Sequence, residues 1–370
     1  MDTQNWPEGV FPARLIERLA SAGAIRAARS FDPDQVQPAS LDLRLGPKAW
    51  RIRASFLPGP GHTVADRIDS LVLHELDLSD GAVLERNCVY LVPLLEALDL
   101  PADVSASANP KSSTGRLDVF TRVIGDHARG FDILPAGYEG ALYLEISPRT
   151  FPVRVRTGSR LSQMRFRVGD ARLDADGHRA LHAAETLVVD ENEPVADGVS
   201  LSIDLKGEGR NGLIGFRSKR HTAVIDMDRK DALDVLDFWD PLVNRGSEQF
   251  ILDPDEFYIL VSREAVHVPP GHAAEMVPFD PLVGEFRVHY AGFFDPGFGH
   301  SAAGGTGARA VLEVRSREVP FLLDHGQTIG RLVYERLAAP ADRLYGTGLG
   351  SNYQAQTLKL SKHFRPYRQS

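Results

Sequence analysis

The sequence contains a long internal repeat. Residues 88–166 align with residues 256–334 at a constant offset of 168 positions, and the matching residues need no gap. A match of this length indicates two copies of one structural unit. The pairs that stay in step include Tyr90 and Tyr258, Glu96 and Glu264, Pro101 and Pro269, Glu145 and Glu313, Pro152 and Pro320, and Gly158 and Gly326.

Two segments outside this alignment help to place the domain boundary. Residues 40–43 resemble residues 200–203 at an offset of 160, so the halves differ there by an insertion or deletion. The acidic, proline-containing stretch 190–194 is the best candidate for a linker. At 370 residues the chain has the length of two or three ordinary domains. We therefore expect a first repeat over residues 1–189 and a second over residues 195–370.

Within each half the pattern is that of β-strands. Apolar residues recur at every second position in residues 41–45 and 151–155, and Pro and Gly bound these segments. Helical patterns are few: the best covers residues 12–22, and residues 178–186 and 229–239 are weaker candidates. The sequence predicts a mainly β protein of two tandem β-barrel-like or jelly-roll-like domains with a few short helices.

Charge and cysteine content exclude several classes of protein. A net charge of −8 opposes the phosphate-neutralising surface that nucleic-acid binding needs, although a local cluster of Arg and Lys can still bind a small anion. The single cysteine, Cys88, forms neither an intrachain disulfide nor a cysteine-rich zinc site. No apolar run approaches 18 residues, and the first residues lack the features of a signal peptide. We expect a cytoplasmic protein with neither a nucleic-acid nor a membrane partner.

The stretch 111–116, Lys-Ser-Ser-Thr-Gly-Arg, is the first candidate for chemistry. Small hydroxyls beside Lys and Arg in a turn suit a polyphosphate, because hydroxyl and backbone N–H groups donate to its oxygens and Arg binds two of them at once. An ordinary serine-rich turn is the alternative for this stretch taken alone.

Glu145 and Glu313 are candidates for a general base. Each stands between two apolar residues of a strand pattern, at matching positions of the repeat. A carboxyl group buried on such a strand has a raised pKa, which is the condition for a base that works near neutral pH. The alternative is an outward-facing strand glutamate, but most other polar positions have diverged between the halves.

Three motifs of the first half resemble the dCTP deaminase branch of the dUTPase-like superfamily. The phosphate motif of that family, Arg-Ser-Ser-x-x-Arg-Leu, is matched by residues 111–117, with Lys111 in place of the first Arg. Its Gly-Trp-x-Gly-x-x-x-Leu-Glu motif is matched by residues 137–145, with Tyr138 in place of Trp. Residues 158–166 resemble its Gly-x-x-Ile-x-Gln-x-x-Phe strand.

Further segments resemble the same family, so that the resemblance covers most of the chain. Residues 38–46 resemble its opening, and residues 291–299 resemble the hairpin that reads the base. The tail from Tyr345 through residues 352–356 resembles the C-terminal lid that closes over the nucleotide. The resemblance implies that the substrate is bound by Lys111, Ser112, Ser113, Arg116, Tyr138, Gln163, Ala291, Asp295, Phe298, Tyr345, Tyr353 and Gln356.

The resemblance implies dUTPase-like distorted β-barrels with active sites between subunits, and a homotrimer of fused chains is the expected assembly. It also implies hydrolytic deamination of dCTP to dUTP and ammonia without zinc, which would feed the synthesis of dUMP and dTTP. In that reaction the glutamate takes a proton from the attacking water, and Mg²⁺ enters with the triphosphate. The cysteine content agrees, since zinc deaminases need a Pro-Cys-x-x-Cys set that Cys88 alone cannot supply.

Departures from the family pattern leave two arrangements open. The first half keeps the phosphate turn but has Pro135 where an Asp is expected, whereas the second half has Asp295 but lacks the phosphate turn. Either the first repeat holds the whole site, or the phosphate turn of one repeat meets the base pocket of another. We favour Glu145 over Glu313 as the base, because Glu145 shares a repeat with an intact phosphate turn.

Two other functions stay open. A dUTPase, or an enzyme with both activities, would use an Asp of the hairpin to activate water, and Asp295 allows this. A regulator that binds dCTP or dUTP without turnover is the alternative from another class.

Overall fold

Strands dominate the structure, so the prediction of a mainly β protein is confirmed. Between the described residues the strands pair into six sheets. The barrel-like closure of each half stays a prediction, because these pairings define separate sheets. The structure is a computed structural model, and it describes residues 6–189, 195–207, 212–278, 286–289, 292–316, 318–346 and 357–367.

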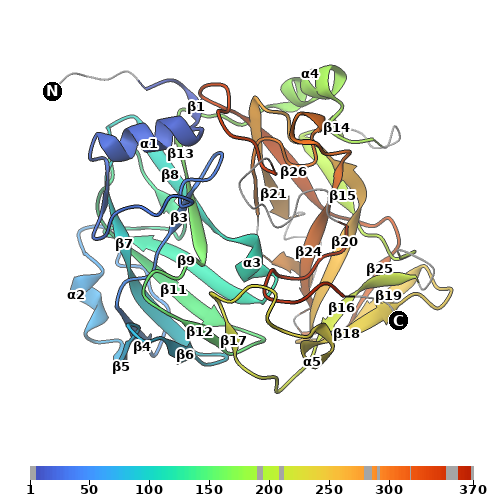
Figure 1. Cartoon of the computed structure of the whole chain (residues 1–370), viewed down its shortest axis with the longest axis horizontal. Helices are drawn as coiled ribbons and strands as arrows, with labels where there is room; N and C mark the ends of the chain where they lie inside the picture. The colour runs from blue at the N-terminus through green and yellow to red at the C-terminus, as the bar shows by residue number, and fades with distance from the viewer. Residues whose placement is uncertain are drawn as a thin grey trace.

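The first half is built on the long strands of its central sheet, where β7 and β11 pair along most of their length (Figure 1). Its elements are β1 (Gly9–Val10), α1 (Ala13–Ser21), β2 (Ile25–Ala27), β3 (Leu41–Leu43), β4 (Lys48–Ile52), α2 (Ala65–Ile68), β5 (Val72–Asp77), β6 (Ala82–Leu84), β7 (Val89–Asp99), β8 (Val104–Pro110), α3 (Ser112–Gly115), β9 (Val119–Gly125), β10 (Ile133–Leu134), β11 (Glu139–Pro148), β12 (Val153–Val155) and β13 (Ser162–Val168).

The second half contains a similar succession of elements. They are α4 (Ala175–Glu185), β14 (Val195–Ala196), β15 (Gly198–Ser202), β16 (Leu213–Ser218), β17 (Ile225–Asp226), α5 (Val235–Phe238), β18 (Trp239–Val243), β19 (Gln249–Leu252), β20 (Phe257–Val266), β21 (His272–Pro278), β22 (Phe286–His289), β23 (Phe293–Phe294), the 3₁₀ turn η2 (Ser301–Ala303), β24 (Ala308–Ser316), β25 (Phe321–Asp324) and β26 (Thr328–Arg336).

The two halves share one order of strands. The sheet β5-β4-β7-β11-β9 of the first half corresponds to β18-β16-β20-β24-β22 of the second, and β13-β8-β10 corresponds to β26-β21-β23. The registers also agree: Glu145 of β11 lies opposite Leu91 of β7, and Glu313 of β24 lies opposite Ile259 of β20. Residues 168 positions apart in the sequence therefore occupy equivalent positions in the two sheets.

The helices test three expectations from the sequence. Those over residues 12–22 and 178–186 are confirmed as α1 and α4. The one expected over residues 229–239 is wrong for most of its length, since only the short α5 is helical there. The backbone N–H groups of Asp231 and Leu233 donate to carbonyl groups of the segment 357–367 instead of to their own turn.

Helix α4 makes its contacts with the second half, as α1 does with the first. It leads to Val188, which bridges to Val266 of β20, just as β2 follows α1 and pairs with β7. The backbone N–H of Tyr334 donates to Nε2 of His178 over 3.0 Å. Residues 174–189, which the predicted boundary placed in the first repeat, thus pack with the second.

A segment of the second half crosses over to the first. Strand β17 joins β12 as a parallel neighbour, with Ile225 beside Val153. The rings of Phe238 and Trp239 lie edge-on to Phe151, with centroids 5.8 and 5.3 Å away. The small sheet β17-β12-β6 therefore contains strands of both halves.

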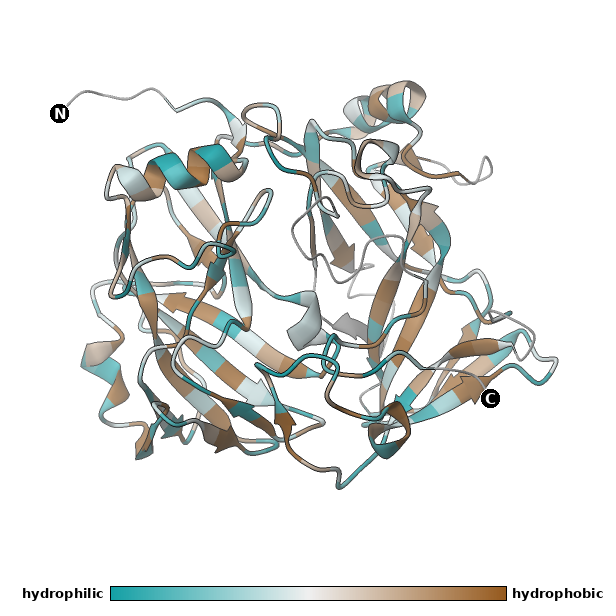
Figure 2. Cartoon of the chain, in the orientation of Figure 1, coloured by the Kyte–Doolittle hydropathy of each residue, from teal (hydrophilic) through white to brown (hydrophobic). Residues whose placement is uncertain are grey.

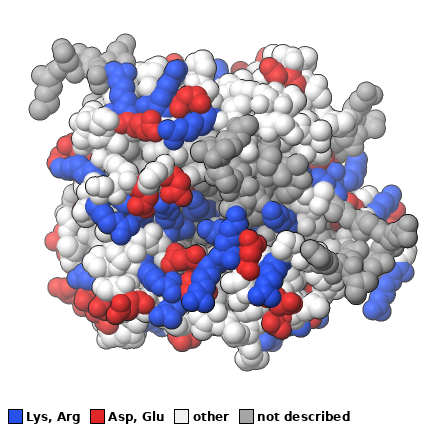
Figure 3. Space-filling model, in the orientation of Figure 1, with Lys and Arg blue, Asp and Glu red and all other residues white. Residues whose placement is uncertain are grey.

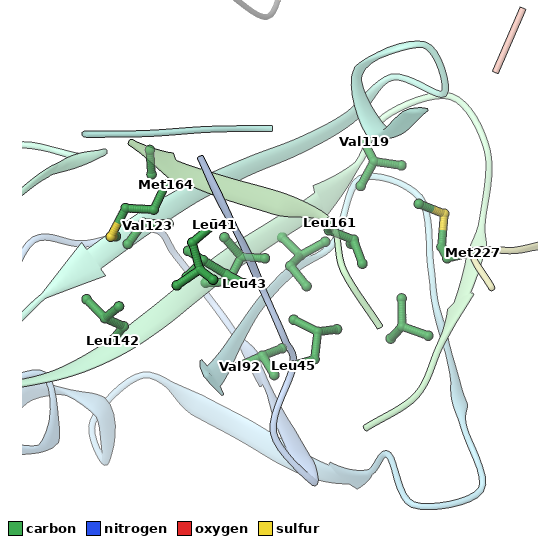
Figure 4. Packing of buried hydrophobic residues seen from close by; sticks show 14 of the residues in the cluster. Leu41, Leu43, Leu45, Val92, Val119, Val123, Leu142, Leu161, Met164 and Met227 are labelled. Atoms are coloured by element: carbon green, nitrogen blue, oxygen red, sulfur yellow. The ribbon is translucent and has the colours of Figure 1, made fainter. Parts of the chain in front are cut away.

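The apolar side chains form two main cores, one in each half, and apolar segments run through the interior of both (Figure 2). The first core is shared, because Met227 of the second half belongs to the same cluster as Val119 and Leu161 of the first (Figure 4). Burial of these shared side chains opposes separation of the halves.

Candidate active site

The predicted phosphate turn lies at the junction of the two halves. Lys111 is extended, and α3 follows it as a single helical turn near the middle of the molecule (Figure 1). Arg116, directly after the turn, is almost fully buried and donates to the carbonyl oxygen of Lys359 over 2.8 Å. Lys111 forms an ion pair with Asp42. Two cations therefore flank the serines of this turn.

Glu313 faces that turn from the second half. Alternate residues of β24 point to opposite sides: Leu312 belongs to the core of the second half, and Val311 belongs to the core of the first. Glu313 shares the side of Val311 and interacts electrostatically with Arg116 and Asp118. The alternation of the strand thus turns this glutamate towards the phosphate turn.

The environment of Glu313 suits proton transfer near neutral pH. Burial raises the pKa of Glu313 to about 8, while Arg116 lowers the pKa and Asp118 raises it. A carboxyl group with a pKa of about 8 is mostly protonated at neutral pH, and its ionised fraction is a stronger base than an ordinary carboxylate. That is the property required of a group that takes a proton from water and delivers it to a base.

Asp118 and Arg315 link the turn to strand β24. Asp118 has a φ of 55°, in the left-handed region that only a few residue types adopt. Its carboxylate accepts a hydrogen bond from Oγ1 of Thr150 over 2.6 Å and pairs with Arg315. Asp118 stands two residues after Arg116, and Arg315 stands two residues after Glu313. The ion pair therefore fixes the arginine and the glutamate relative to each other.

Glu145 lies in a different environment from Glu313. Its neighbours on β11, Leu144 and Ile146, point into the core of the first half, so Glu145 points to the opposite side. There it accepts a hydrogen bond from Nε of Arg122 over 2.9 Å, and Cζ of Arg122 lies 3.6 Å from the centre of the Phe131 ring. The hydrogen bond and ion pair of Glu145 with Arg122 thus lie within the first half. The geometry brings Glu313, rather than the favoured Glu145, to the phosphate turn.

The hairpin that was predicted to read the base also reaches the junction. Asp295 follows β23 and is buried beside charged residues of the first half. Burial raises the pKa of Asp295 to about 6; Arg165 and Lys111 lower the pKa, and Asp42 raises it. The hairpin of the second half therefore lies beside the residues that flank the phosphate turn of the first.

Aromatic rings hold the hairpin against the start of the predicted lid. The Phe298 ring packs on Phe294 and Tyr345, with centroids 5.0 and 5.8 Å away. The backbone N–H of Tyr345 donates to the carbonyl oxygen of Pro296 over 2.8 Å. Gly297 has a φ of 94°, and a Cβ there would lie 2.9 Å from Cβ of Leu344. The other predicted residues of this region, Ala291, Tyr353 and Gln356, lie outside the described residues.

Two predicted substrate-binding residues of the first half have local roles. The Tyr138 hydroxyl donates to the carbonyl oxygen of Ala141 over 2.6 Å and accepts from the backbone N–H of Asp126 over 2.9 Å. These bonds link the segment before β11 to Asp126, which follows β9. Gln163 pairs in register with Asp42, the partner of Lys111, and is therefore the nearer of the two to the phosphate turn.

The segment 357–367 also contacts the turn, which the sequence did not reveal. The Ser361 hydroxyl lies 2.7 Å from the carbonyl oxygen of Ser113 and 2.9 Å from Nδ1 of His363. Burial, and next the neighbouring Lys111, lower the pKa of Lys362. Lys and Arg side chains gather around the middle of this face (Figure 3). The two lysines of Lys-Leu-Ser-Lys at residues 359–362, just beyond the predicted lid, were the available signal.

Proteins of known family match both halves of this arrangement. The family models for the N-terminal and the C-terminal domain of 2′-deoxycytidine 5′-triphosphate deaminase match residues 7–170 and 174–364. The chain belongs to the 2′-deoxycytidine 5′-triphosphate deaminase family. The resemblance found in the sequence is therefore confirmed.

Individual members of the dCTP deaminase family agree. The chain is 35% identical over 156 residues to the dUMP-forming dCTP deaminase of Methanoculleus marisnigri, a match to 41% of this chain and 76% of the relative. It is 32% identical over 157 residues to the dCTP deaminase of Halorubrum lacusprofundi, covering 42% of this chain and 74% of the relative. The crystal structure of 2′-deoxycytidine 5′-triphosphate deaminase from Agrobacterium tumefaciens is 66% identical, with a TM-score of 0.87, and the match covers 90% of this chain and 99% of that chain.

Two kinds of feature do not occur in the described part of this family member. No group of three or more His, Cys, Asp or Glu side chains there could hold a metal ion. No helix there is long and apolar enough to cross a membrane. The expected zinc-free chemistry stays a prediction.

The raised pKa of Glu313 predicts a pH-dependent effect of Glu313→Gln on stability. Between the ordinary pKa of 4.5 and the folded value of about 8, the folded protein holds a proton at Glu313 that the unfolded chain releases. The wild-type protein therefore loses stability as pH rises through this window, and glutamine removes the loss. We expect the Tm of the variant minus that of the wild type to grow from pH 5 to pH 8 in thermal unfolding scans. A difference independent of pH would contradict this.

Proposed function

We propose that the chain catalyses the hydrolytic deamination of dCTP to dUTP and ammonia, with Glu313 as the proton-transferring group. One observation carries the proposal: Glu313 of the second half is buried beside Arg116, which directly follows the phosphate turn of the first half. Family membership supports the substrate class. The turn Lys111–Arg116 is proposed to bind the triphosphate. Asp295 and Phe298 are proposed to shape the site that receives the base.

The chemistry needs one water molecule and one carboxylate. Ionised Glu313 takes a proton from water while the oxygen attacks C4 of cytosine, and the proton then passes to N3. The second proton of the water goes to the 4-amino group, which leaves as ammonia as the C4–N bond breaks. Proton transfer by a positioned side chain contributes about 10²–10⁴-fold to such a reaction. Mg²⁺ is proposed to arrive on the triphosphate, whose oxygens are its preferred ligands.

A second activity, release of dUMP, is favoured by one residue. Asp295 is a buried carboxyl group whose pKa is raised to about 6, close to the range of a base that activates water at neutral pH. The similar protein of Methanoculleus marisnigri carries the name dUMP-forming. Attack of a second water molecule on the triphosphate would yield dUMP and pyrophosphate.

The test is to incubate the protein with dCTP and Mg²⁺ in chelator-treated, zinc-free buffer and to separate the nucleotides by chromatography. Formation of dUTP and ammonia supports deamination without zinc, and formation of dUMP and pyrophosphate supports the double activity. Survival of dCTP, together with a raised Tm in its presence, would overturn the proposal in favour of a binding regulator. The trimer of fused chains and the cytoplasmic location stay predictions.

Arg116→Met is expected to weaken binding of dCTP by roughly 10–100-fold, because hydrogen bonds to charged groups contribute about 1.5–3 kcal/mol. Calorimetric titration with dCTP in the presence of Mg²⁺ measures the effect. The matched control is Arg217→Met, which removes an arginine from a surface ion pair with Asp240. Equal affinities for the Arg116 and Arg217 variants would contradict a role in binding the triphosphate.

A further inference from the structure

Arg165 reaches from the first half to the second. It stands on β13, and neither its side chain nor that of its partner Glu335 has any exposed surface. Its Nη1 donates to Oε2 of Glu335 over 2.9 Å and to the carbonyl oxygen of Ala274 over 3.2 Å. Strands β21 and β26 of the second half thereby anchor one edge of the guanidinium group.

The rest of the same guanidinium group contacts the hairpin 293–299. Nη2 donates to the carbonyl oxygen of Phe294 over 3.4 Å and lies 3.6 Å from Oδ1 of Asp295. Cζ lies 4.0 Å from the centre of the Phe293 ring, within the range of a cation–π interaction. One arginine of the first half therefore contacts three consecutive residues of the second-half hairpin.

The strand itself does not require an arginine at this place. The repeat puts Val333 of β26 at the position of Arg165. Arg165 lies opposite Ser107, and Val333 lies opposite the corresponding residue Glu275. Burying a guanidinium group costs free energy unless its charge is paired and its N–H groups are bonded. An apolar residue serves the second half, so the arginine of the first half is explained by its contacts across the junction.

We propose that Arg165 is a positioning residue for deamination, which holds the hairpin 293–299 in the conformation that receives the cytosine base. The inference rests on the proposed function, because contact between this hairpin and the base follows from the family resemblance. Arg165 acts through Phe293, Phe294 and Asp295 and touches no reacting atom.

The ionisation of Asp295 makes the role of Arg165 visible in the pH profile of kcat/KM, which a purely structural role would not change. The charged groups that face it are Arg165 of β13 and Lys111 before α3, which lower its pKa, and Asp42 of β3, which raises it. Without the guanidinium group, Asp295 keeps its proton to a higher pH. If the hairpin works with Asp295 ionised, the acid limb of the pH profile of kcat/KM then moves to higher pH.

The experiment compares three variants of the full chain: Arg165→Met, Arg165→Lys and Arg167→Met. Arg167 is the matched control. It also pairs with Glu335, over 2.9 Å, but its Nη2 donates to the hydroxyl of Ser107 instead of to the hairpin. We expect Arg165→Met to lower kcat/KM for dCTP by roughly 10²-fold, the size of effect produced by misplacing a contact by about 1 Å. We also expect its acid limb to move to higher pH, and the limb of Arg167→Met to stay in place.

Arg165→Lys keeps the charge but loses the fork that reaches Phe294. This variant is expected to keep the acid limb of the wild-type pH profile and to have a lower kcat/KM. If Arg165→Met fails to fold, Arg165→Lys alone tests the proposal. Equal changes in Arg165→Met and Arg167→Met, or full activity in Arg165→Lys, would overturn the proposal.

Failure of the proposed function gives a different result. If the wild-type chain releases no ammonia from dCTP, deamination itself is wrong, and the role of Arg165 is then tested by the dissociation constants of the wild type and Arg165→Met for dCTP. We expect these to differ at least tenfold in calorimetric titrations, roughly the effect of losing 1.4 kcal/mol of binding. Equal constants would overturn the role of Arg165 as well.

Discussion

Glu313→Gln is expected to lower the turnover of dCTP by about 10²–10⁴-fold, the contribution of a positioned acid–base group. Glutamine keeps the size of the side chain but cannot take a proton from water. Glu145→Gln is expected to keep the turnover of the wild type, because Glu145 pairs with Arg122 of its own half. Ammonia release under single-turnover conditions measures both rates.

The two variants control for each other. They make the same substitution at corresponding positions of the repeat, one in each half. Thermal unfolding shows that each is folded before its rate is compared. Loss of turnover in Glu145→Gln with normal turnover in Glu313→Gln would restore the arrangement in which the first repeat holds the whole site.

Arg44→Met is expected to lower the free energy of unfolding by about 3–5 kcal/mol, because it leaves a buried carboxylate without its cation. The side chains of Arg44 and Glu96 have no exposed surface, and Nε donates to Oε1 over 2.7 Å. Gln35 donates to the same oxygen over 2.8 Å and is too weak a replacement for the charge. The midpoint of urea unfolding measures the loss.

A surface ion pair is the control for this stability effect. Arg217→Met removes an arginine whose side chain is 41% exposed, and such pairs contribute about 0–1 kcal/mol. An effect of Arg44→Met as small as that of Arg217→Met would contradict the assigned role of the buried pair. In the second half the corresponding carboxylate, Glu264, accepts hydrogen bonds from the backbone N–H of Ser202 over 2.7 Å and from its hydroxyl.

The sequence predicted those properties that depend on pattern along the chain. The alternation of apolar and polar residues indicated the strands. The repeat indicated that Glu145 and Glu313 occupy corresponding strand positions, and they lie on the corresponding strands β11 and β24. The sequence also indicated a turn at residues 111–116, and the structure has the single helical turn α3 there. Its binding of phosphate stays a prediction.

The sequence could not predict which faces meet across the junction. The alternation that turns Leu312 into the second core and Glu313 to the opposite side of β24 is the same whether that opposite side meets solvent or the other half. Which glutamate meets Arg116 depends on the packing of Val311 in the first core and on the ion pair of Asp118 with Arg315. These are contacts between residues nearly 200 positions apart, and a single sequence contains no signal for them.

The exchange of a strand between the halves has a consequence for how such a gene can change. Because β17 completes the sheet that contains β12, neither half is a module that recombination could move intact into another gene. A crossover between the halves would place Val153 beside a foreign strand instead of Ile225. The two halves therefore form one unit of inheritance, because a change in one half alters the surroundings of the other.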